Sequence, residues 1–104
     1  RKTWIASLGL PLGTIVIDGG AVEAIHKEGS SLLAVGVVAV RGNFDRGDLI
    51  ICEDSEGKEV AKGLSNFSSE EIALVKGLNT KELLKKLDQV ADEEIIHRNN
   101  LILS

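Results

Sequence analysis

Short runs of β-branched and aliphatic residues, separated by glycine-containing or acidic segments, constrain the fold of this chain more than any other feature. Four of them lie at 14–17, 35–40, 49–52 and 59–64. Runs of this length are typical of buried strands and are too short for core helices. Between the third and fourth runs, 54–57 has the composition of a hairpin turn in which Gly57 takes a positive φ. The sequence therefore predicts a β-rich domain.

A helix is predicted between the first two of these strands. Asp18 follows the first run as a suitable N-cap, and the apolar residues at 21, 22, 24 and 25 have helical spacing. Gly29 is placed to end this helix in the left-handed conformation. The stretch 26–37 therefore begins on the last turn of a helix and continues into a buried strand.

The second half of the chain predicts two more helices and two more strands. Ser68 and Glu71 have the spacing of a capping box, and Phe67 and Ile72 that of a hydrophobic staple. Gly77 ends that helix, and a third helix is expected over about 80–90. Its apolar face is predicted to hold Leu83, Leu84 and Leu87. Short strands at 94–97 and 101–103 complete a set of about six, with a turn at 98–100. The expected fold is α+β and β-rich, a partly closed barrel of six short strands with two to three helices.

Length and charge limit the organisation and the partners of the chain. Its 104 residues fit one domain, 1–104, in which 1–13 is a leading segment with the only proline, Pro11. The single cysteine is typical of a reducing compartment, and no apolar run reaches membrane length. The formal net charge is −4, whereas nucleic-acid-binding domains usually present a basic face.

No arrangement of residues predicts catalysis. The phosphate-binding pattern G-x-x-x-x-G-K-[ST] and the H-E-x-x-H zinc pattern do not occur. His26 and His97 are interpreted as structural or exposed side chains, and Cys52 as a core residue of the third strand. Arg46-Gly47-Asp48 spells an adhesion tripeptide, but Gly47 reads as a turn residue before a strand. The chain therefore has the character of a binding or regulatory module.

The order of these motifs resembles that of the PUA domain, a small pseudo-barrel appended to RNA-modifying enzymes and to some metabolic enzymes. The resemblance lies in Asp18-Gly19-Gly20-Ala21 and in the segments 29–37, 42–48 and 61–64. The flanks, 1–5, 64–70 and 96–101, are similar to the C-terminal PUA domain of bacterial glutamate 5-kinases.

The resemblance to these kinases implies the role of the parent enzyme and the partners of this domain. Such enzymes transfer the γ-phosphate of ATP, with magnesium, to the side-chain carboxylate of L-glutamate, the first step of proline biosynthesis. Their catalytic residues belong to an N-terminal amino-acid kinase domain, so no catalytic residue, cofactor or metal is assigned to this chain. The resemblance implies a cytoplasmic protein whose partners are that kinase domain and other copies of the protein.

Two roles for the domain follow. In the first it is an accessory domain acting through contacts with the kinase domain, for which Trp4, Ile5 and Pro11 are the candidates. In the second it binds RNA in the groove that RNA-binding PUA domains form along the first helix and the loop after it. Glycine and serine allow close backbone approach and hydrogen bonds to phosphate. The RNA candidates are Lys27, Gly29, Ser30, Ser31, Gly36, Arg41 and Arg46. The competing interpretation is structural: Gly29 ends the helix, Gly36 relieves a tight bend, and the barrel is filled by Leu32, Leu33 and Val35.

Overall fold

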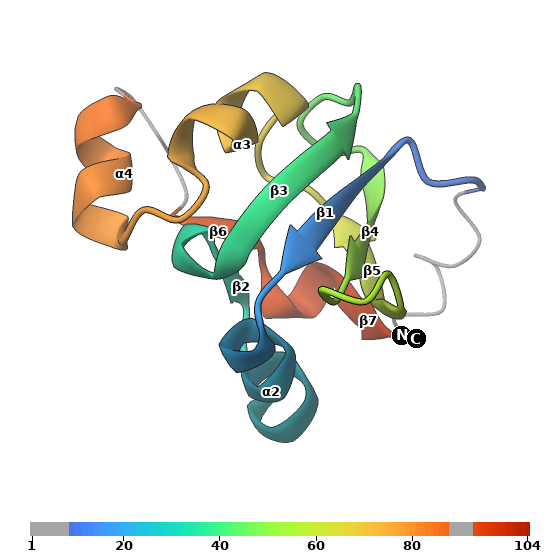
Figure 1. Cartoon of the computed structure of the whole chain (residues 1–104). Coiled ribbons are helices and arrows are strands. Elements are labelled where there is room, and N and C mark those ends of the chain that lie inside the picture. Colours follow the sequence, from blue (N-terminus) through green and yellow to red (C-terminus); the bar gives the residue numbers. More distant parts are fainter. Residues whose placement is uncertain (1–8, 88–92) are drawn as a thin grey trace.

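The computed structural model describes residues 9–87 and 93–104, which form two sheets and several short helices (Figure 1). The larger sheet has the strand order β3-β1-β4-β5-β7, and β2 pairs with β6 in a small second sheet. The strands are β1 (Gly13–Ile17), β2 (Leu32–Leu33), β3 (Val37–Gly42), β4 (Leu49–Glu53), β5 (Glu59–Leu64), β6 (Glu94–Ile96) and β7 (Leu101–Leu103). The helices are α2 (Gly19–Glu28), α3 (Ser69–Val75) and α4 (Thr80–Lys86), with 3₁₀ turns η1 (Ala34–Gly36) and η2 (Arg98–Asn100). None of the helices in these ranges is both long and apolar enough to cross a bilayer.

β1 lies inside the larger sheet, antiparallel to β3 and parallel to β4. Ile15 is paired with Val40 on one side and with Cys52 on the other. Ile15 and Cys52 are fully buried, so this row of side chains faces the core. The neighbouring row joins Thr14 to Arg41 and to Ile51, and its members are half-buried or exposed. Because paired residues share a face of a sheet, the sheet has one core face and one outward face.

Helices α3 and α4 close the core from the side of β3, and α3 packs directly on that strand (Figure 1). Ser68 and Glu71 form the predicted capping box at the start of α3. Phe67 and Ile72, the predicted staple pair, are both buried. A second capping box, Asn79 with Glu82, starts α4. Sequence-local caps therefore set where both helices begin.

The predicted α+β, β-rich class is confirmed, and three details of the prediction are wrong or incomplete. The run 35–40 is not one strand, because η1 occupies Ala34–Gly36 before β3 begins. The two-residue strand β2 was not predicted. Leu84 was expected on the buried face of the third helix with Leu83, but its side chain is 48% exposed while Leu83 is fully buried. Residues 88–90 of that predicted helix lie outside the described residues.

Two adjacent isoleucines of β4 test the assignment of the sheet faces. Ile50 is fully buried, whereas Ile51 lies half-buried on the outward face. Ile50→Ala should lower the free energy of unfolding by about 2–5 kcal/mol, since it leaves a cavity in the core. The matched variant Ile51→Ala should lose well under half of that. Urea unfolding of both variants measures the difference, and equal losses would contradict the assignment.

Candidate functional site

A groove lies between α2 and the segment that follows it, with a volume of about 370 Å³. Its lining residues come from the first turns of α2 on one side and from β2, η1 and the residues before them on the other. Leu32 is buried as expected, but Leu33 and Val35 are 41% and 53% exposed. They therefore do not fill the barrel and instead give the groove an apolar rim. Its polar groups come from Asp18, Ser30 and Ser31. The groove therefore offers hydroxyls and one carboxylate above an apolar surface.

The close approach of Gly36 to α2 shapes this groove. A Cβ atom at position 36 would lie 2.7 Å from the Cβ of Ala21, so only glycine fits there without a shift. The backbone N–H of Asp18 donates to the carbonyl of Gly36 at 2.9 Å. The Asp18 side chain accepts from the N–H of Ala21 at 2.8 Å and so caps the helix as predicted. These contacts fix η1 against the start of α2.

The backbone amides of Gly29 and Ser30, which could otherwise bind a phosphate, donate hydrogen bonds to the C-terminal end of α2. Gly29 has φ 62° and ends the helix in the predicted left-handed conformation. Its N–H donates to the carbonyl of Ile25 at 3.2 Å, and the N–H of Ser30 donates to Ala24 at 3.3 Å. Both amides are therefore engaged in the helix end rather than directed at a ligand.

A second hollow, of about 430 Å³, continues the groove through Ser30, Ser31 and Leu33. Its other residues, Glu94, His97 and Arg98, come from the C-terminal segment. The N–H of Arg98 donates to the hydroxyl of Ser31 at 2.8 Å. Sequence reasoning did not assign Glu94 or Arg98 to the site, because they lie about sixty residues beyond the groove.

The ring of His97 is oriented by its own turn. Its Nδ1 accepts the N–H of Asn99 at 3.1 Å, so in the neutral ring the proton is on Nε2. Nε2 lies 3.8 Å from a carboxylate oxygen of Glu94. The predicted structural role of this histidine is therefore visible as a cap of η2, and its free edge faces an acid.

The three basic residues predicted to bind RNA each lie beside a carboxylate. The ammonium of Lys27 is 3.7 Å from Glu23, and the guanidinium of Arg41 is 2.6 Å from Glu53. Arg46 pairs with Glu71. Arg41 and Arg46 line hollows of their own, separate from the groove of Ser30, Ser31 and Gly36. The structure therefore brings together the serines and the glycine, but not the cations.

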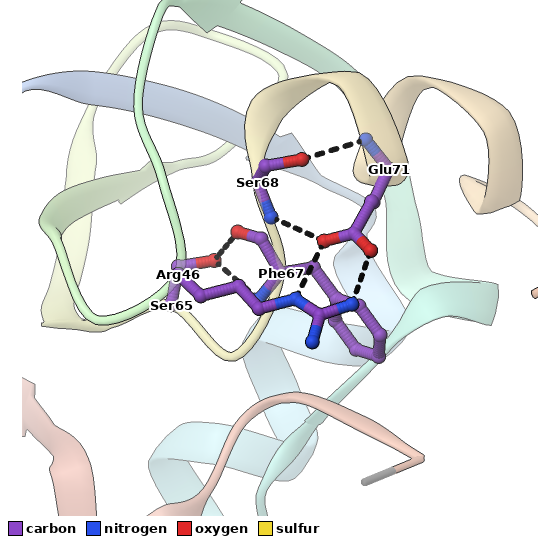
Figure 2. A network of polar contacts seen from close by, with 5 residues as sticks. All are labelled: Arg46, Ser65, Phe67, Ser68 and Glu71. Carbon is purple, nitrogen blue, oxygen red and sulfur yellow. Dashed lines mark hydrogen bonds and ion pairs between the residues drawn. The ribbon is translucent and has the colours of Figure 1, made fainter. Parts of the chain in front are cut away.

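Arg46 is the centre of a polar network that joins the β3–β4 loop to α3 (Figure 2). Its Nε donates to Glu71 Oε1 at 2.9 Å, and the same oxygen accepts the N–H of Ser68 at 2.9 Å. The hydrogen bond from Arg46 is the main cause that lowers the pKa of Glu71 to about 2. The pair raises the pKa of Arg46 in turn. Glu71 therefore serves both the local helix cap and a tertiary ion pair.

The hydroxyl of Ser65 forms two hydrogen bonds in the segment that leads into α3. It donates to the carbonyl of Phe67 at 2.5 Å and accepts the Phe67 N–H at 3.2 Å (Figure 2). The backbone carbonyl of Ser65 accepts the N–H of Gly47 at 2.7 Å, in the same loop as Arg46. This network is structural, because its donors and acceptors are directed at each other.

The residues predicted for domain contact are only partly described. Trp4 and Ile5 lie outside the described residues. Pro11 is half-buried, and its neighbours Leu10 and Leu12 are 88% and 55% exposed. Cys52, predicted as a core residue, is fully buried, and burial raises the pKa of its thiol to about 12. That thiol is therefore protonated and unreactive near neutral pH.

Comparison with known proteins identifies the family. The sequence model of the PUA domain family matches residues 13–87, which include the whole groove and the Arg46 network. The chain belongs to the PUA domain family. The groove between α2 and η1 and the strands β1, β3, β4 and β5 thus lie in the part of the chain that matches the family.

The similarity to whole proteins extends beyond the part that matches the family. This PUA domain is 45% identical over 103 residues, 99% of its length, to glutamate 5-kinase of Saccharophagus degradans. It is 45% identical over 104 residues, its full length, to glutamate 5-kinase of Dictyoglomus turgidum. It spans 28% of the length of either relative.

A similarity to a solved structure supports the fold. A PUA domain from Aeropyrum pernix, crystallised as a tartrate complex, superposes with a TM-score of 0.58 at 24% identity. The superposition covers 86% of this chain and 45% of that one. The predicted PUA-type architecture is therefore confirmed.

The ion pair of Glu71 predicts a pH-dependent stability. Because the pKa of Glu71 is lowered to about 2 from 4.5, its contribution is complete above pH 4.5 and is lost as the pH falls towards 2. Glu71→Gln keeps an acceptor for the cap but removes the charge. Its melting temperature should lie below that of the unmodified domain at pH 6, and the gap should close as the pH falls towards 2.

Glu82→Gln is the control for this prediction. It makes the same substitution at the matching capping-box position of α4. Thermal unfolding at pH 6, followed by circular dichroism, should show a smaller decrease in melting temperature for Glu82→Gln than for Glu71→Gln. Equal losses would mean that Arg46 adds nothing to the cap.

The contact at Gly36 predicts a localised effect on the groove. Gly36→Ala should destabilise the domain by about 1–3 kcal/mol, since the added methyl group overlaps Ala21. Gly19→Ala is the matched control, because a Cβ there meets nothing within 4 Å. Urea unfolding should show little change for the control. A neutral Gly36→Ala variant would contradict the close approach of η1 to α2.

Proposed function

We propose that this chain is the accessory PUA domain of a glutamate 5-kinase. The observation that carries the proposal is 45% identity to such kinases over 99% of the chain, which includes residues outside the family match at 13–87. The chain spans only 28% of the relative's length, so the catalytic machinery would lie in the remainder. That remainder would be an N-terminal amino-acid kinase domain. It would hold ATP and magnesium and phosphorylate the side-chain carboxylate of L-glutamate, the first step of proline biosynthesis, in the cytoplasm.

The domain itself would act through contact, not chemistry. The thiol of Cys52 is buried and protonated, and the Arg46–Glu71 pair is engaged in holding a loop on α3. A folded domain of this kind can tune the regulation, metal dependence or assembly of the enzyme to which it is joined. Its partners would be the kinase domain of the same chain and further copies of the enzyme.

RNA binding is the alternative, and the charges of the domain favour it less. Lys27, Arg41 and Arg46 already lie beside carboxylates, and the net charge is −4. Phosphate contacts by free cations supply most of the non-specific affinity for nucleic acid. The observation on the side of RNA is the groove itself, with its two serine hydroxyls.

Deleting the domain from the full-length protein tests the accessory role. Both the intact and the shortened protein should release ADP from Mg-ATP only when L-glutamate is present. The deletion should change the KM for glutamate, the inhibition by proline, the magnesium requirement or the oligomeric state. The kcat should change by less than about tenfold, which corresponds to about 1.4 kcal/mol of activation free energy. Absence of glutamate-dependent ADP release from the intact protein would refute the proposed activity. An unchanged shortened enzyme would refute the accessory role.

The RNA alternative has its own measurement. Amide NMR of the domain, titrated with a structured RNA at low and moderate salt, should show no clustered shifts under the accessory role. Salt-sensitive shifts at Lys27–Gly36, Arg41 and Arg46 would establish RNA binding instead. In that case the double variant Lys27→Ala and Arg46→Ala should abolish the shifts.

A further inference from the structure

An apolar surface surrounds the start of β1 on the outward face of the sheet. Its members are Leu10, Leu12, Thr14 and Ile51, called here the lead-in surface, and they line a shared hollow of about 420 Å³. Leu10 is 88% exposed and Leu12 is 55% exposed, so large apolar side chains face solvent. Isolated exposed leucines are common on proteins, whereas exposed apolar side chains that gather around one hollow are a candidate interaction surface.

The register of the sheet explains why these side chains point outward. Thr14 pairs with Ile51 in the outward row of the sheet. Leu12, the residue before β1, lines the same hollow as these two side chains. Gly13, which follows Leu12, faces the core and touches the ring of Phe44. The lead-in surface is thus a continuation of the sheet, not a loose end of the chain.

The backbone under these side chains is held in place. The N–H of Leu12 donates to the carbonyl of Leu49 at 2.9 Å, which extends the contact between β1 and β4. Gly42 packs so closely that a Cβ there would lie 2.9 Å from the carbonyl oxygen of Leu12. Binding to a surface that is already ordered loses little conformational entropy.

The charges at its edge favour an apolar partner over a nucleic acid. The guanidinium of Arg41 borders the hollow but pairs with Glu53 at 2.6 Å. Further along the same outward row, Lys62 lies 4.0 Å from Glu59. Among the described residues, this edge is therefore neutral in sum, and both of its cations lie beside carboxylates that compete with phosphate for them.

We propose that the lead-in surface is where the kinase domain of the same chain docks. The inference rests on the proposed function, in which most of the protein lies outside this chain, since the chain spans 28% of its relatives. Residues 9–12 lead directly into β1, so any part of the protein that precedes residue 9 connects to the described sheet beside this surface. A kinase domain attached at this end of the chain is connected closer in sequence to Leu10 and Leu12 than to the exposed leucines of α3 and α4, which favours docking at the lead-in surface.

Thiol labelling of the full-length protein tests the docking. Leu12→Cys places a thiol in the proposed interface, and Leu74→Cys places one on α3 at nearly equal exposure, 55% against 57%. The native Cys52 does not interfere, because it is buried and its thiol pKa is about 12. Alkylation by a maleimide is followed by peptide mass mapping, and rates in urea normalise the two sites.

The thiol introduced by Leu12→Cys should react about tenfold more slowly than that introduced by Leu74→Cys, a ratio equivalent to about 1.4 kcal/mol in favour of the docked state. Thr14→Cys should show the same protection. Equal normalised rates at both sites would overturn the docking. Protection that disappears on dilution would assign the surface to a second copy, and protection that appears only with added RNA would assign it to RNA; either result overturns the proposal.

The same preparation separates the inference from the proposed function. Glutamate-dependent ADP release together with an unprotected Leu12→Cys thiol would refute only the docking. A protected thiol in a protein that lacks this activity would refute the kinase assignment, and with it the identity of the docked domain, but not the docking of an attached domain at this surface. Leu12→Cys is not a catalytic substitution, because Leu12 lies in the accessory domain.

Discussion

The position of β1 between an antiparallel and a parallel neighbour is the constraint on which the rest of this domain depends. The start of β1 must be glycine, because a Cβ at Gly13 would lie 2.2 Å from the Phe44 ring and 2.9 Å from the carbonyl of Arg41. That ring is buried, and the backbone of Phe44 exchanges hydrogen bonds with Ser69 at the first turn of α3. One contact between a glycine and an aromatic ring therefore connects the middle of the sheet to the helix that covers it.

The interactions that the sequence could reveal are those between close neighbours along the chain. The caps at Asp18 and Ser68, the turn at Gly57 and the left-handed Gly29 each depend on residues within four positions, and each was predicted. The β2–β6 pair was missed, because a two-residue strand has no period to detect. Its partner strand is about sixty residues away, so the second hollow of the groove could not be assembled from local patterns either.

The candidate RNA-binding residues show that ion pairs between distant residues, like strand pairs, cannot be predicted from local sequence patterns. The sequence places Arg41, Arg46 and Lys27 near a groove, but the role of each depends on which carboxylate faces it. Arg41 meets Glu53 twelve residues later, and Arg46 meets Glu71 twenty-five residues later. Only the Lys27–Glu23 pair has a spacing visible in the sequence. Whether a cation is available to a ligand therefore depends on the tertiary structure. The net charge of the sequence gives only the balance of all charges and does not show which cations are paired.

A domain whose candidate RNA-binding cations lie beside carboxylates, and whose leading residues carry exposed leucines, is suited to contacts within a protein. Interfaces between domains of one chain bury about 600–1,500 Å² and are more polar than permanent subunit interfaces. A short tether raises the effective concentration of the attached partner to about the millimolar range, so weak contacts suffice. Leu10 and Leu12 would be too small a surface to capture a separate protein, yet a tethered domain could occupy them for most of the time. The same tether lets a change in the attached domain release the surface, because an equilibrium that is only slightly favourable is also easily shifted.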